Sequence, residues 1–140
     1  MTSSTALIFF LVGILIVGVL LIIVIALTRK TPKGIKVEEF QEAWLRIENS
    51  VTDDVSTQYM AILSADKLLD KALKILRYKG ETMGERMTSA SRVFSKREAV
   101  WAAHKMRNRI AHEDSVKISI GLTKRALTSF KKALKDLGAL

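Results

Sequence analysis

The chain has 140 residues with no cysteine, and its 23 lysines and arginines against 14 acidic residues leave a formal charge of +9. The lack of cysteine excludes disulfides, thiolate metal sites and cysteine nucleophiles. A basic surplus suits anionic lipid headgroups or nucleic acid, and composition alone does not choose between them.

The first predicted element is a membrane-spanning helix over residues 6–28, preceded by a short uncharged tail at residues 1–5. Ala6 to Leu27 contains no charged residue and is long enough to cross a hydrocarbon core of about 30 Å. A cleaved signal peptide fits less well, because no basic residue precedes the run and no small-residue cleavage site follows it. This helix is therefore predicted to hold the chain in a lipid bilayer.

A basic linker over residues 29–36 follows the span, with Arg29, Lys30, Lys33 and Lys36 as its charged residues. The positive-inside rule places this side in the cytoplasm and the N-terminus outside. The pattern predicts a single-pass protein of the plasma (inner) membrane, with these four side chains in contact with anionic headgroups or nucleic acid.

Residues 37–140 are predicted to form one all-α cytoplasmic domain of four to five helices, because apolar residues recur at helical spacing and no strand pattern occurs. The first helix covers residues 37–49, with Trp44 on its buried stripe. The second runs from near residue 54 to residue 79 and ends at Gly80. Its wide apolar arc predicts that it is the central helix of the bundle.

Two carboxylates lie one turn apart on this long helix, at Asp66 and Asp70. They could form a pair for metal binding or acid–base work, or belong to a solvated face with Lys74 as an i,i+4 partner. The solvated face is preferred, because no third ligand has a natural place.

A short helix within residues 80–91 and a final helix over residues 116–137 complete the predicted bundle, with Gly138 as the last stop. Asp136 is the only acidic residue after Asp114. The exposed basic residues of this last helix are predicted to contact nucleic acid or lipid: Lys124, Arg125, Lys131 and Lys132.

Residues 95–114 read as one helix that contains both histidines of the protein, His104 and His112. Ser95 is a predicted N-cap, and Glu98 would complete a capping box with it. The next capping candidates are Asp114 and Ser115, so the helix is predicted to end near His112.

Arg107 and Asn108, followed after three residues by His112, resemble the Arg-x4-His motif of the HEPN families, in which a polar residue usually follows the arginine. The surrounding AVWAAHKMRNRIAHE, preceded by ADKLLDKALK, is similar to small membrane-anchored bacterial proteins with a HEPN-like domain. HEPN domains are compact helical bundles that include many RNA-cleaving toxins, and also RNA or nucleotide binders and scaffolds that do not cleave.

The resemblance implies a metal-independent endoribonuclease without a cofactor as the leading candidate function. His112 would act as base or acid, because an imidazole titrates near neutrality. Arg107 would hold the phosphate, and Asn108 would orient substrate or partner. The resemblance also implies a homodimer with a shared site. His104 shares a stripe with Trp101, so a core or interface position is preferred for it over a catalytic role.

Helix geometry opposes a direct contact within one chain, because five residues leave Arg107 and His112 about 140° apart around an unbroken helix. Either the helix loosens before His112, or the two residues meet only through a second chain. His104, Asn108 and His112 do share one face.

Two other functions remain open at this point. One is a non-enzymatic membrane-anchored scaffold or adaptor that dimerises or binds a partner through the 95–114 helix. A weaker one is a metal site formed by His104, His112 and Glu113. The two histidines would be about 12 Å apart along a helix, too far for one ion without further ligands.

Overall fold

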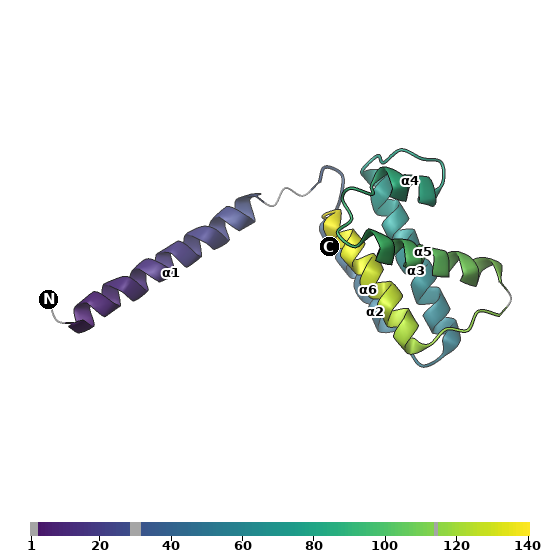
Figure 1. The fold of residues 1–140 in the computed structure, drawn as a ribbon, viewed down its shortest axis with the longest axis horizontal. Coiled ribbons are helices and arrows are strands. Elements are labelled where there is room, and N and C mark those ends of the chain that lie inside the picture. The colour runs from purple at the N-terminus through teal and green to yellow at the C-terminus, as the bar shows by residue number, and fades with distance from the viewer. Residues whose placement is uncertain (1–2, 29–31, 114) are drawn as a thin grey trace. The chain divides into compact units, whose positions relative to one another are not determined.

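A computed structural model describes residues 3–28, 32–113 and 115–140, and this part of the chain is all-helical, with six helices and no strand. The all-α prediction is confirmed. The chain divides into two compact units, residues 1–30 and residues 31–140, and Figure 1 shows the helices of each.

Helix α1 (Ser3–Thr28) forms the first unit. Its segment Thr5–Ile25 is long and apolar enough to cross a membrane, as predicted. Its large apolar side chains from Leu7 to Ile25 are exposed in the protein itself. The basic residues Arg29 and Lys30, predicted to follow the span, lie outside the described residues.

The second unit contains five helices, and α3 (Val55–Ile75) contacts all the others. They are α2 (Val37–Ser50), α4 (Met83–Ser89), α5 (Arg97–His112) and α6 (Ile120–Asp136). The prediction that the long helix is central is confirmed. Helix α5 packs on two neighbours, α3 and α6.

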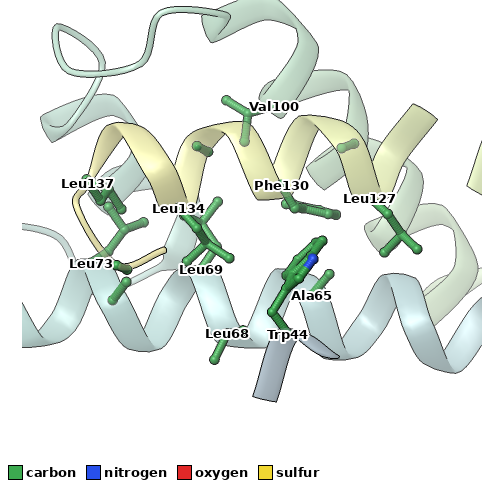
Figure 2. Packing of buried hydrophobic residues seen from close by; sticks show 14 of the residues in the cluster. Trp44, Ala65, Leu68, Leu69, Leu73, Val100, Leu127, Phe130, Leu134 and Leu137 are labelled. Carbon is green, nitrogen blue, oxygen red and sulfur yellow. The ribbon is translucent and has the colours of Figure 1, made fainter. Parts of the chain in front are cut away.

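The hydrophobic core lies between α6 and α3, which run side by side, and Figure 2 shows Leu134 of α6 beside Leu69 of α3. Both side chains are fully buried, as is Phe130 one turn earlier on α6. Trp44 brings α2 into this core and is buried, as predicted. The core also includes Ile35, from the last part of the predicted linker.

Helix α3 ends earlier than predicted, at Ile75, and Gly80 does not terminate it. Arg77 takes the left-handed conformation with φ of 59°, and the amides of Arg77 and Tyr78 donate to the carbonyls of Lys74 and Leu73. These two hydrogen bonds form the Schellman arrangement that usually uses glycine. At the end of α6 the same arrangement does use the predicted glycine, Gly138.

Helix α6 begins later than predicted, at Ile120, with the side chain of Ser119 accepting from the amide of Leu122 as its N-cap. The preceding Val116 is buried, and its carbonyl accepts a hydrogen bond from the hydroxyl of Tyr59 on α3. These contacts hold residues 116–119 outside the helix. The predicted cap Ser115 is therefore not the N-cap of α6, and the other predicted cap, Asp114, lies outside the described residues.

Candidate functional site

Helix α5 carries the residues of the predicted motif and is unbroken from Arg97 to His112. Its end is as predicted, but the predicted capping box at its start is wrong. Lys96 is the N-cap residue and makes no side-chain capping bond. Ser95 instead donates both its amide and its hydroxyl to Asp136 at 2.8 Å, which fastens the start of α5 to the end of α6.

Asp66 of α3 lies at the centre of the polar contacts between α3 and α5. Its side chain is 4% exposed, so the prediction that it belongs to a solvated face is wrong. One carboxylate oxygen is 2.7 Å from Nδ1 of His104, and the other is 3.2 Å from Nε of Arg107. A buried carboxylate needs such partners, because burial without them is very costly.

His104, Asn108 and Arg107 close a ring of contacts with Asp66. The side-chain nitrogen of Asn108 is 3.2 Å from Nε2 of His104, and Nη1 of Arg107 donates to the side-chain oxygen of Asn108 at 3.2 Å. We call Asp66, His104, Arg107 and Asn108 the polar ring. It joins the arginine and the polar residue of the motif to a histidine one turn earlier.

The contact between Arg107 and Asp66 is an ion pair without a directed hydrogen bond. The Nε of Arg107 is within ion-pair distance of Asp66 but is buried without a hydrogen-bond partner. The side chain is 34% exposed, so its outer edge remains open to the surface. Arg107 can therefore keep its contact with Asp66 and still donate to a bound anion.

The polar ring lies on the wall of an open cleft of about 1070 Å³ between α3, α4 and α5. The charged residues of this cleft are Asp66, Lys67, Asp70, Lys74, Lys105 and Arg107. Four cations against two carboxylates leave the cleft basic, which favours an anionic ligand.

Asp70 does not add free negative charge to the cleft, because it pairs with Arg86 and Lys74, each at 2.7 Å. The i,i+4 contact with Lys74 is the one predicted. Burial acts to raise the pKa of Asp70, but hydrogen bonds and charge from Lys74 and Arg86 outweigh it and hold that pKa below its ordinary value. Arg86 also donates to the carbonyls of Gly80 and Glu81, so this pair fixes the loop before α4.

His112 lies apart from the polar ring, exposed at the C-terminal end of α5. The alternative in which the helix loosens before His112 is wrong, because α5 stays helical through that residue. Within one chain, a straight helix keeps His112 about 140° from Arg107. A contact between the two therefore requires a second chain.

Trp101 lines the same cleft one turn before Lys105 and is partly buried. Its ring meets the imidazole of His104 edge-on, with centroids 6.0 Å apart and an angle of 79° between the planes. His104 is itself buried. The packing of Trp101 limits the orientations open to the imidazole.

The basic residues predicted to contact nucleic acid or lipid differ in how far they are already paired. Lys36 pairs with Glu39, Lys131 with Glu48, and Lys132 with Asp136. Lys33, Lys124 and Arg125 have no acidic partner among the described residues, and all three are exposed.

Within residues 3–28, 32–113 and 115–140, no three His, Asp or Glu side chains lie close enough together to hold a metal ion. The weaker option of a site from His104, His112 and Glu113 therefore has no support in the described residues. Glu113 instead pairs with Arg109, 3.2 Å away.

Comparison with known protein families, with curated proteins and with solved structures gives no match to this chain. The polar ring and its cleft are therefore interpreted from their own geometry.

The sequence interpretation missed the role of Asp66, although the helical pattern contained a signal for it. Asp66 lies four residues after Ile62 and three before Leu69, and both of these are buried. A charged residue at those spacings shares the apolar face and needs a buried partner. His104 and Arg107 on α5 are those partners.

Proposed function

We propose that this chain is a membrane-anchored protein with a HEPN-like domain that binds RNA and cleaves it without a metal ion. The observation that carries the proposal is the polar ring on a basic cleft wall. There, Arg107 and Asn108 of the motif adjoin Lys67 and Lys105. Guanidinium and ammonium groups are suited to phosphate oxygens, and RNA presents a phosphate at every nucleotide.

In this proposal, Arg107 holds the scissile phosphate and Asn108 orients the ribose or the base. His112 acts as acid or base from a second chain, because the unbroken helix keeps it from Arg107 of its own chain. The protein is accordingly a homodimer with a site completed by both copies, and it needs no cofactor.

The test is cleavage of an end-labelled, structured RNA by the full-length protein in detergent micelles with EDTA. Arg107→Ala and His112→Ala are expected to lose activity. Arg109→Ala is the matched control, since Arg109 is on the same helix, 61% exposed and paired with Glu113. Intact RNA after incubation with folded, dimeric wild-type protein would refute the proposal.

We further propose that the domain lies in the cytoplasm and the N-terminus outside, in the plasma (inner) membrane of a bacterium. The support is the apolar helix α1 followed by Lys33 and Lys36, together with Arg29 and Lys30. In this orientation the basic linker faces anionic headgroups of the inner leaflet, and RNA is within reach of the cleft.

The second candidate function is a non-enzymatic scaffold, and a groove between α5 and α6 favours it. Its lining includes Ala99, Ala102 and Met106 from α5 and Leu122 from α6. Leu122 is 38% exposed and adds apolar surface to this groove. Ala102→Trp would fill the groove. Loss of self-association in this variant, together with wild-type protein that self-associates but leaves RNA intact, would favour the scaffolding function.

A further inference from the structure

The two neighbours of His104 assign hydrogen-bond roles to its ring nitrogens. The Asp66 carboxylate, 2.7 Å from Nδ1, can only accept a hydrogen bond, so Nδ1 carries the proton. The side-chain amide of Asn108, 3.2 Å from Nε2, donates, so Nε2 is the acceptor. These contacts orient Nε2 of His104 as the acceptor nitrogen of the imidazole.

This basic nitrogen belongs to a residue that lines the basic cleft, within the same network as the Arg107 guanidinium. A proton acceptor beside a phosphate-binding cation is the arrangement that strand cleavage at a ribose requires. His112 cannot supply it within one chain, because it lies at the exposed end of the helix, well around from Arg107.

We propose that His104 is the general base of the cleft, acting in the same chain as Arg107, and that Asp66 is its positioning residue. This inference rests on the proposed function and adds to it the residue that accepts the proton. His112 of the second chain then remains free for the acid role.

The reaction balances without a further reactant. The RNA 2′-hydroxyl replaces the Asn108 amide as donor to Nε2 of His104, which takes its proton. The electron pair of the 2′ oxygen forms a bond to phosphorus, and the bond from phosphorus to the 5′ oxygen breaks. The 5′ oxygen takes a proton from the imidazolium of His112 in the second chain, and the proton on His104 returns to His112 through the solvent. The products are a 2′,3′-cyclic phosphate and a 5′-hydroxyl.

The decisive variant is His104→Asn, because an asparagine amide can still donate to Asp66 but offers no basic nitrogen. In the RNA assay above, with full-length protein in micelles, we expect kcat to fall about 100- to 10,000-fold with little change in KM. The charged groups that line the cleft with His104 are Asp66, Lys67, Asp70 and Lys74 from α3 and Lys105 and Arg107 from α5, whereas α4 contributes uncharged residues to the cleft.

Mixed assemblies test whether the site lies in one chain. A mixture of Arg107→Ala and His104→Asn proteins is expected to stay inactive, since no chain in it carries both residues intact. A mixture of Arg107→Ala and His112→Ala proteins should recover activity, because those two residues come from different chains. Recovery in the first mixture would overturn the same-chain assignment.

A spectroscopic measurement makes the test independent of how well His104→Asn folds. His112→Ala leaves His104 as the only histidine, so ¹⁵N labelling of histidine reports its tautomer directly. A proton on Nδ1 supports the proposal, and a proton on Nε2 refutes it. Wild-type protein that leaves RNA intact would overturn both proposals, whereas cleavage that survives in His104→Asn would overturn this one alone.

Discussion

Asp66 is a buried carboxylate that contacts two side chains of another helix. Its two oxygens contact His104 and Arg107, both from α5. The helical periodicity of α3 contained a signal for the burial of Asp66, as described above. The identity of its partners could not be predicted from the sequence, because it depends on how α3 and α5 pack.

Asp66→Ala is expected to lower the free energy of unfolding by about 3 kcal/mol, because it leaves buried donors on α5 without an acceptor. Asp66→Asn should cost less, since the amide oxygen can still accept from His104. The measurement is urea unfolding of the full-length protein in micelles, followed by circular dichroism. Asp53→Ala is the control, because Asp53 is exposed. Equal stability of Asp66→Ala and wild type would contradict the structure of the polar ring.

The ion pair of Asp70 with Arg86 and Lys74 predicts a loss of stability in acid. Because the pKa of Asp70 is lowered in the folded protein, the unfolded chain binds the proton more readily. The contribution of this carboxylate is complete above its unfolded pKa of about 3.9 and is lost as the pH falls through the lower folded value. Thermal midpoints measured between about pH 5 and pH 2 should fall less steeply in Asp70→Asn than in wild type. Parallel curves for the two proteins would show that Asp70 has no such role.

The extents of the helices could be predicted where one face of the helix determines them. Helix α2 begins and ends close to the predicted residues because Phe40, Trp44 and Ile47 are all buried on one stripe. The start of α5 could not be predicted, because Ser95 has the composition of a cap but bonds to Asp136, far along the chain. At that position, the tertiary contact between Ser95 and Asp136 replaces the local N-cap hydrogen bond.

The end of α3 predicts an unusual stabilising substitution. Arg77 adopts φ of 59°, which costs a residue with a Cβ more than glycine, and its side chain is exposed. Arg77→Gly is therefore expected to raise the free energy of unfolding by about 0.5–1 kcal/mol. Urea unfolding measures it, and a decrease in stability would show that the left-handed turn is not retained.

Gly80→Ala is the contrasting substitution in the same loop. A Cβ at Gly80 would lie 2.6 Å from Cβ of Glu85 and 2.7 Å from the amide nitrogen of Arg86, and φ is 145°. We expect a loss of about 2 kcal/mol, since the loop would have to move away from α4. If Gly80→Ala unfolds like wild type, the close approach of this loop to α4 is absent.

At the scale of the whole molecule, the apolar helix α1 and the helical domain could both be predicted from the order of apolar and polar residues in the sequence. The span is a continuous apolar run, and the domain follows from apolar stripes at helical spacing. The cleft could not be predicted in the same way, because three helices from separate parts of the sequence form it. Its basic character depends on which charges become paired, as Asp70 does with Arg86.

The proposed orientation in the membrane predicts which end of the chain is accessible from outside the cell. Because the chain has no cysteine, a single introduced thiol is the only site for a membrane-impermeant maleimide. Thr2→Cys should be labelled on intact spheroplasts, and Ser115→Cys, at an exposed position of the domain, should be labelled only after lysis. Both variants must react after lysis, which controls for a thiol that is simply unreactive. Labelling of Ser115→Cys on intact spheroplasts would place the domain outside, away from cytoplasmic RNA, and would refute both the topology and the proposed function.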